Sequence, residues 1–169
     1  KKNTPGTLKA YAEYVRRSEN PLPLLVADLG EQPAEAILRE IGEPRLRGML
    51  RLAGYIPNSD LPAIYNRASA FLYTSLRESF GIPQLEAMAC GTPVVTSATS
   101  AIPEVAGEGA ILVDPTDPKA IADALLRLET DAAFRARQVA YGLERVKRFS
   151  WEKTARHLLA LYESLGKTN

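Results

Sequence analysis

The sequence contains few residues of the kinds that build disulfide frameworks or zinc sites. It has one cysteine, Cys90, and one histidine, His157, among 169 residues. A single cysteine excludes an internal disulfide and fits a reducing compartment. The chain also offers no set of histidine and thiolate ligands for a metal ion. We therefore expect neither a metal site nor a cofactor.

Long apolar runs and an excess of charge of one sign are missing too. No apolar stretch approaches the roughly 20 residues that cross a bilayer as a helix, and no signal peptide opens the sequence. The formal net charge is +1, which gives no electrostatic reason to expect a nucleic-acid partner. These absences predict a cytoplasmic protein that does not bind nucleic acid.

What is present is the ordinary composition of a globular domain. Hydrophobic residues make up 46% of the chain and charged residues 24%, and 169 residues is the length of one domain that buries roughly 70% of its unfolded surface. Short apolar runs alternate with patterns of helical period. The expected strands cover residues 22–27, 49–53, 70–73, 93–96 and 111–113. The expected helices cover residues 4–17, 34–41, 61–65, 83–90, 103–106, 118–128, 131–148 and 151–162, with Thr4, Ser59 and Ser150 as candidate N-caps.

This alternation predicts an α/β fold with a Rossmann-like, doubly wound parallel sheet that has helices on both faces. In such sheets ligands bind beyond the carboxyl ends of the strands. The segment from Thr74 to Gly81 leaves one of these ends, and Gly54-Tyr55 leaves another. We therefore expect the functional residues to gather at that edge.

The stretch from Ser75 to Val95 carries the most informative pattern. Glu78 and Glu86 flank a Phe80-Gly81 turn and Pro83, which suits the start of a helix, and Gly91 lies where a left-handed C-cap would end that helix. Free N–H groups at a helix N-terminus form an anion site, and carboxylates accept hydrogen bonds from hydroxyl groups. This arrangement suits a ligand that carries both phosphates and sugar hydroxyls.

Four further segments and the start of the last helix extend the pattern. They are Gly54-Tyr55-Ile56-Pro57, Ala70-Phe71-Leu72-Tyr73-Thr74-Ser75, Pro103-Glu104-Val105, Leu112-Val113-Asp114-Pro115 and Phe149-Ser150-Trp151-Glu152. Together with the two glutamates, which have seven residues between them, they resemble the retaining glycosyltransferases of family 4. The resemblance covers nearly the whole chain and matches the C-terminal, nucleotide-sugar-binding domain of their two-domain GT-B fold.

The resemblance implies a role for each matching residue around the donor. Glu78 is the candidate catalytic residue and contacts the hydroxyls of the donor sugar, whereas Glu86 contacts the ribose of the nucleotide. A solvated Glu86 on an exposed helix face is the alternative. The donor-binding turn consists of Ser79, Phe80, Gly81 and Ile82, and the N–H groups of the last three should point at the diphosphate.

Three more residues match donor contacts elsewhere in the chain. Lys2 matches the phosphate-binding lysine, although it could equally be a flexible terminal side chain. Tyr55 and Ile56 match the segment beside the nucleotide base, with a buried tyrosine at a strand end as the alternative. Ala27-Asp28-Leu29-Gly30 departs from the glycine-rich turn usual after that strand. Gly107-Glu108-Gly109 echoes a dinucleotide fingerprint but precedes a strand, where the fingerprint would have to follow one.

The resemblance implies a retaining glycosyltransferase that takes its sugar from a nucleotide diphosphate sugar. The serine of the Ser-Ala-Ile-Pro-Glu-Val segment favours a mannosyltransferase and GDP-mannose. The alternatives are a nucleotide-sugar epimerase and a nucleotide-sugar-binding module without catalysis. The acceptor, a glycan or a lipid, would be held mainly by an N-terminal domain, and the full protein could associate peripherally with a membrane.

In the family, a strand and a loop with an arginine precede the lysine that Lys2 matches. The sequence enters a helical pattern almost at once. We therefore interpret residues 1–169 as one donor-binding domain, a fragment without its first strand, which should bind donor weakly and transfer no sugar alone.

Overall fold

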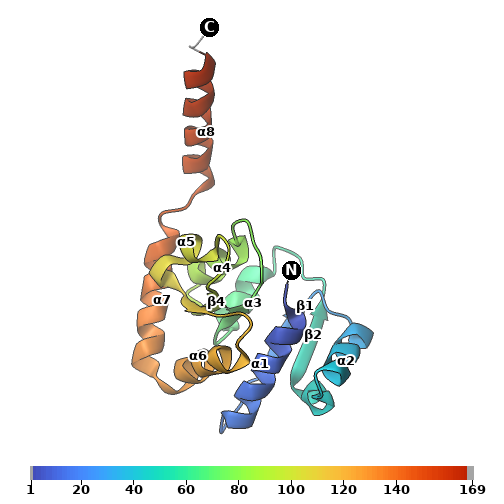
Figure 1. The fold of residues 1–169 in the computed structure, drawn as a ribbon. Coiled ribbons are helices and arrows are strands. Elements are labelled where there is room, and N and C mark those ends of the chain that lie inside the picture. Colours follow the sequence, from blue (N-terminus) through green and yellow to red (C-terminus); the bar gives the residue numbers. More distant parts are fainter. Residues whose placement is uncertain (1, 167–169) are drawn as a thin grey trace.

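The computed structural model describes residues 2–166, in which parallel strands alternate with helices (Figure 1). The strands are β1 (Leu24–Ala27), β2 (Leu50–Gly54), β3 (Phe71–Tyr73), β4 (Val94–Ser97) and β5 (Ile111–Val113). The helices are α1 (Thr4–Arg17), α2 (Glu31–Glu40), α3 (Leu61–Arg67), α4 (Ile82–Ala89), α5 (Ile102–Ala106), α6 (Pro118–Thr130), α7 (Ala132–Val146) and α8 (Trp151–Gly166), with 3-10 turns η1 (Pro44–Met49) and η2 (Gly107–Gly109). The predicted parallel α/β fold is confirmed.

The strands form two parallel groups. β1 pairs with β2, and β3, β4 and β5 pair in that order. Leu72 lies opposite Val95, and Thr96 lies opposite Leu112. Every one of these pairings is parallel, so each connection has to return over a face of the sheet, and the helices provide that return. The expectation of a further strand before Lys2 stays a prediction.

β4 lies at the centre of the larger sheet and shows why helices cover both faces. All four of its residues are buried. Val95 packs in a core with Ala10 of α1 and Ile121 of α6. The neighbouring Val94 points the opposite way, since side chains alternate along a strand, and it packs with Met88 of α4. A strand buried on both faces needs an apolar layer on each side, and here α1 and α6 form one layer and α3 and α4 the other.

Helix α1 joins the two sheets. Its Leu8 belongs to a core with Leu38 of α2 and Leu50 of β2, whereas its Ala10 belongs to the core around β4. α1 also packs along α6 (Figure 1). This helix therefore fixes where its own N-terminus lies relative to the larger sheet.

The structure corrects several local expectations. β1 was expected to be a buried strand, but its residues alternate between half-buried and exposed, and Leu25 is 46% exposed. Thr4 is not the N-cap of α1, because Asn3 takes that position with its side-chain amide bonded to the Pro115 carbonyl. Asp60, not Ser59, precedes α3. The first difference concerns burial, and the other two are shifts of one residue at the start of a helix.

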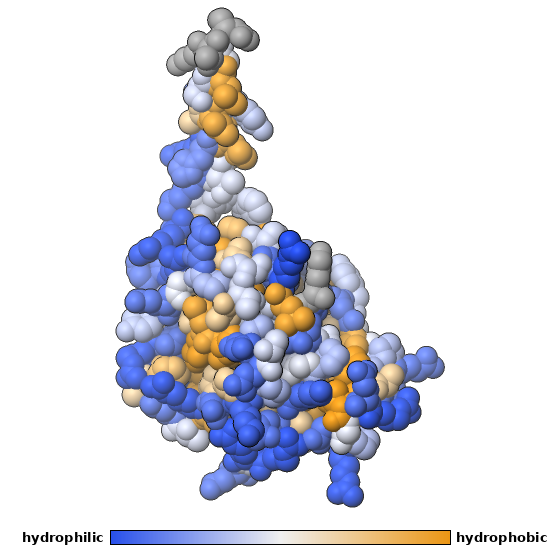
Figure 2. All heavy atoms as spheres, viewed as in Figure 1, coloured by the Kyte–Doolittle hydropathy of each residue, from blue (hydrophilic) through white to orange (hydrophobic). Residues whose placement is uncertain are grey.

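Helix α8 stands away from the other elements (Figure 1). Every residue of it is exposed. Ser150 caps it as predicted, since its Oγ accepts from the Lys153 N–H at 3.1 Å. Apolar side chains gather on the C-terminal half of α8 (Figure 2), and this exposed apolar stripe includes Leu158, Leu159, Tyr162 and Leu165. Within residues 2–166, no helix combines the length and the apolar character that crossing a membrane would require.

Candidate functional site

The segment after β3 is held in place by side-chain hydroxyls. Four hydroxyls, from β4 and from the loop that follows it in the chain, donate to carbonyl oxygens of residues 73–78. The bonds run from Thr96 to Tyr73 (2.9 Å), Ser97 to Ser75 (2.6 Å), Thr99 to Leu76 (3.4 Å) and Ser100 to Glu78 (2.6 Å). Because each bond fixes a backbone carbonyl, the loop that carries Glu78 has a defined path to α4.

Sequence reasoning missed this support. The signal was visible, since Thr96-Ser97-Ala98-Thr99-Ser100 contains four hydroxyls in five residues. Thr96 and Ser97 lie in a strand and are fully buried, where a hydroxyl needs a partner. The sequence does not show which backbone carbonyls accept from these hydroxyls, because those carbonyls lie more than twenty residues earlier in the chain.

The N-terminus of α4 has no cap from a side chain. Gly81 precedes the helix with φ +89°, and no acidic residue lies in the first turn. By contrast, Asp117 accepts from two N–H groups at the start of α6, and Asp131 from one at the start of α7. Capping satisfies these donors and places negative charge where an anion would bind. α1, α2, α3 and α5 also lack a side-chain cap, so what distinguishes the start of α4 is that its free N–H groups lie between Glu78 and Glu86.

The helix starts and stops close to the predicted places. It begins at Ile82, so Pro83 takes its second position, where its missing N–H is still without cost. At the other end Gly91 has φ +72°, its N–H bonds to the Met88 carbonyl, and the Thr92 N–H bonds to the Ala87 carbonyl. These two bonds form a Schellman motif. The predicted glycine C-cap is therefore confirmed.

Glu78 and Glu86 each lie beside a tyrosine. The Tyr65 hydroxyl donates to Glu86 Oε2 at 3.4 Å, and Glu86 is otherwise exposed on α4. Burial first, and then the Glu86 carboxylate, raises the pKa of Tyr65 to about 12. Burial and the Glu78 carboxylate likewise raise the pKa of Tyr73. Both phenols therefore keep their protons at neutral pH and can donate to the carboxylates.

The two tyrosines belong to one aromatic group. Phe71 meets Tyr65 edge to face, with ring centroids 5.2 Å apart, and stacks on Tyr73 at 5.8 Å. This group packs beneath the start of α4, since a Cβ added to Gly81 would lie 3.5 Å from the Tyr73 ring. Neither tyrosine was expected to lie near the glutamates. The number of residues between each tyrosine and its glutamate gives no indication that the two side chains meet.

Of the remaining turn residues, Ser79, Phe80 and Ile82 are open to solvent and Gly81 is not. Ser79 is exposed, and Phe80 and Ile82 are 42% and 43% exposed. Gly81 is buried, and added side-chain atoms there would lie 2.9 Å from the Gln84 amide nitrogen. The backbone at Gly81 therefore lies where only glycine fits without strain. The structure brings Ser79, Phe80, Gly81 and Ile82 together with Glu78 around the start of α4.

Lys2 lies next to the same edge of the sheet. Thr7 of α1 and Thr74, directly after β3, share a hydroxyl hydrogen bond of 2.6 Å, and Asn3 bonds to the Pro115 carbonyl just after β5. The N-terminus of α1 is thus tied to the carboxyl ends of two strands. Lys2 itself is exposed.

Tyr55 and Ile56 follow β2, in the other sheet. Tyr55 is 79% exposed, so the alternative of a buried tyrosine at the strand end is wrong. The reason is the turn at Gly54, whose φ of +60° directs the chain out of the sheet. Ile56 is half-buried. Among the described residues, the Tyr55 hydroxyl forms no hydrogen bond to the Glu78 loop, so no such bond joins this segment to the α4 turn.

In the turn after β1, Asp28 adopts a left-handed backbone conformation that is more usual for glycine. Asp28 has φ +54°, a left-handed conformation that aspartate tolerates better than most residues. Its N–H donates to the Gly54 carbonyl at 2.8 Å, which ties the ends of β1 and β2 together. The departure from the expected glycine-rich turn is therefore one of residue type.

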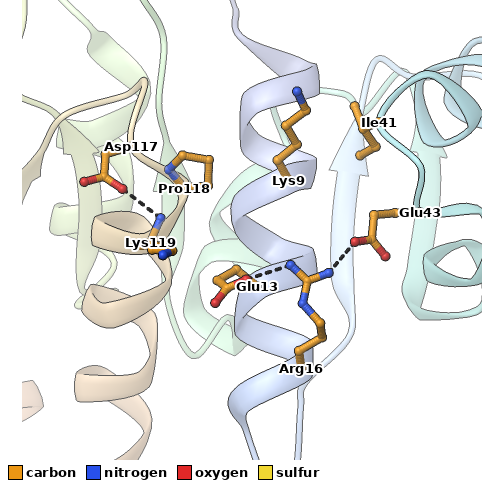
Figure 3. A pocket seen from close by; sticks show the side chains of 8 residues that line it. All are labelled: Lys9, Glu13, Arg16, Ile41, Glu43, Asp117, Pro118 and Lys119. Carbon is orange, nitrogen blue, oxygen red and sulfur yellow. Dashed lines mark hydrogen bonds and ion pairs between the residues drawn. The ribbon is translucent and has the colours of Figure 1, made fainter.

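Two hollows in the surface lie away from these residues. One of about 410 Å³ lies between α1, the end of α2 and the start of α6 (Figure 3). Its charges neutralise one another, because Arg16 forms ion pairs with Glu13 and Glu43 (Figure 3). No predicted site residue lines it. Across residues 2–166, no three histidine, cysteine or acidic side chains come together as a metal site would require.

Comparison with known proteins identifies the family of the chain. The family model described as "Glycosyl transferases group 1" matches residues 1–145. The chain belongs to this family. In particular it is the C-terminal half of a GT-B fold, the half in which the α4 turn and its two glutamates lie.

Individual relatives show how much of the protein is covered. The chain is 34% identical over 165 residues to O-antigen chain mannosyltransferase B of Escherichia coli, covering 98% of this chain and 43% of that protein. Among solved structures, sucrose-phosphate synthase from Thermosynechococcus elongatus superposes with a TM-score of 0.82 at 28% identity over 99% of this chain and 43% of the other. Anabaena HepE, solved with UDP and glucose, superposes with a TM-score of 0.74 at 18% identity, over 92% and 44%. The chain thus spans less than half the length of each.

Proposed function

We propose that this chain is the donor-binding half of a retaining glycosyltransferase that uses a nucleotide diphosphate sugar. The observation that carries the proposal is the uncapped N-terminus of α4 with Glu78 before it and Glu86 within it. The diphosphate would lie against the N–H groups of the turn, with Lys2 as a further cation. A preorganised site of this kind stabilises the charge that develops on the leaving nucleoside diphosphate.

The two glutamates have separate roles in this proposal. Glu86 accepts from the ribose hydroxyls, and the Tyr65 hydroxyl, 3.4 Å from its Oε2, orients it. Glu78 accepts from the hydroxyls of the sugar. A carboxylate that accepts from hydroxyls forms charge-assisted bonds, which are stronger than neutral ones. The acceptor attacks from the side of the leaving group, so neither glutamate is a covalent nucleophile.

GDP-mannose is the donor that we favour. The similarity to a mannosyltransferase from Escherichia coli, at 34% identity over nearly the whole chain, supports this choice. UDP-glucose is the second candidate, because HepE, which shares the fold, was solved with UDP and glucose. The acceptor would be a glycan or a lipid bound mainly by the rest of the protein.

Titration calorimetry on the 169-residue chain tests the division of roles. Glu86→Ala should weaken binding of both GDP and GDP-mannose, because it removes the ribose acceptor. Glu78→Ala should leave GDP binding unchanged and weaken only GDP-mannose, by roughly 1–3 kcal/mol for a charge-assisted contact. The matched control is Glu35→Ala, which removes an exposed glutamate of α2.

Equal losses for both ligands in both variants would refute the separate roles. The same titrations with UDP and UDP-glucose decide between the two donors. Repeating them with a chelator present tests whether the N–H groups and Lys2 suffice for the diphosphate, as we propose, since affinity should then stay the same.

A further inference from the structure

The Gly107-Glu108-Gly109 segment, which is no dinucleotide fingerprint, has a packing role. A Cβ on Gly109 would lie 2.9 Å from Arg145 Cβ, and one on Gly107 would lie 3.1 Å from Arg145 Cζ. Both distances are shorter than ordinary van der Waals contact. The two glycines therefore leave the space that the Arg145 side chain of α7 occupies.

Arg145 uses that space to join three elements. Its Nε donates to the Val105 carbonyl at 2.9 Å, and its Nη2 donates to the Glu104 carbonyl. Both acceptors belong to α5, whose last carbonyls have no partner within the helix. The guanidinium carbon also lies 5.2 Å from the centre of the Phe149 ring, within the range of a cation–π contact. Arg145 thus fixes Phe149 relative to α5 and η2.

Phe149 in turn packs against the α4 turn. Its ring meets the Phe80 ring edge to face, with centroids 5.9 Å apart and an angle of 90°. The Phe80 carbonyl accepts from the Gln84 amide at 3.4 Å, and the Gln84 side chain is fully buried. Phe80 is therefore held at its ring by Phe149 and at its backbone by Gln84, directly before the left-handed Gly81.

We propose that Phe149 is a positioning residue for the turn of Phe80, Gly81 and Ile82, and that Arg145 holds Phe149 in place. The role in donor binding rests on the proposed function, in which the N–H groups of this turn meet the diphosphate. An edge-to-face pair favours one orientation of the Phe80 ring, and so it limits the backbone conformations open to residues 80–82.

The experiment compares four variants of the 169-residue chain. Phe149→Ala and Phe149→Leu remove the ring, the second with much of the apolar volume retained in case the first does not fold. Phe149→Tyr keeps the ring. Trp151→Ala is the matched control, since it removes an aromatic residue two positions away that is 79% exposed. Each variant is measured by thermal unfolding, by the ¹⁵N heteronuclear NOE of the residue 80–82 amides, and by titration with GDP and UDP.

We expect Phe149→Ala and Phe149→Leu to lower the heteronuclear NOE at residues 80–82 and to weaken nucleotide binding about threefold to tenfold, the range of an aromatic pair. Phe149→Tyr should restore both, and Trp151→Ala should change neither. Unchanged NOE and affinity in the folded ring-removal variants would overturn the proposal, as would a change that Trp151→Ala reproduces. If the wild-type chain binds neither nucleotide, the proposed function fails for this chain, and the NOE alone decides whether Phe149 orders the turn.

Discussion

Helices α6 and α8 both carry an apolar stripe of helical spacing, but the stripe of α6 is buried and that of α8 is exposed. In α6 the apolar residues Ile121, Ala122, Ala124 and Leu128 are all buried. In α8 an apolar stripe of the same helical spacing is exposed, with Leu158 at 47%, Leu159 at 59% and Tyr162 at 66%. Both helices were predicted from that spacing. A stripe of period 3.6 shows that a helix has an apolar face but does not show what covers that face.

Neighbouring elements explain the difference. α6 packs against α1 along its length and against β4, β5 and α7, so its stripe closes a core from several sides. α8 follows residues 147–150, which lead the chain away from the other helices (Figure 1). Since most helical stability in proteins comes from tertiary packing, α6 should contribute strongly to the stability of this chain and α8 only weakly.

The largest expected effect comes from a matched pair of leucine substitutions. Leu128→Ala in α6 should lower the free energy of unfolding by about 2–5 kcal/mol, because it leaves a cavity at a side chain that is 3% exposed. Leu159→Ala in α8 should change it by less than about 0.5 kcal/mol. Guanidinium denaturation followed by circular dichroism measures both. Similar losses for the two variants would mean that α8 is packed in solution.

A pair of glycine substitutions extends the comparison with a smaller effect. Gly109→Ala should cost about 1–3 kcal/mol of unfolding free energy, because its Cβ would lie 2.9 Å from Arg145 Cβ and 3.2 Å from Met88 Sδ. Gly166→Ala, at the end of α8, meets nothing within 4 Å and should have almost no effect. The same denaturation experiment applies. A neutral Gly109→Ala would show that Arg145 and Met88 move aside easily.

The smallest expected effect is the dependence of stability on alkaline pH. Burial raises the pKa of Tyr65 in α3 from 10.0 to about 12. No residue of α8 is buried in this way. Between these values the folded protein keeps a proton that the unfolded chain has released, so the unfolding free energy falls as the pH rises from about 10 to about 12. Tyr65→Phe cannot ionise and should reduce the fall. Urea midpoints at pH 9 and 11 for both proteins test this, and identical losses would contradict it.

Some features of the candidate site could be predicted from the sequence, and others depend on tertiary packing. The position of Glu78 before α4 and of Glu86 within it followed from Pro83 and Gly91, which mark helix ends through local backbone preferences. The helical spacing of Leu85, Met88 and Ala89 predicts that they form the buried side of α4, yet the buried residues are Gln84, Ala87 and Met88. Burial of a polar glutamine is a property of the surrounding packing, which no local pattern reports.

The sequence by itself determined the order of strands and helices, the C-cap at Gly91 and the family pattern around Glu78 and Glu86, because each depends on residues close together in the chain. Only the tertiary structure decided which groups support them. The hydroxyls of residues 96–100, the Tyr65 phenol and the Phe149 ring all come from distant segments. Such contacts depend on how the elements pack in three dimensions, and that packing also decided that the stripe of α6 is buried and the stripe of α8 is not.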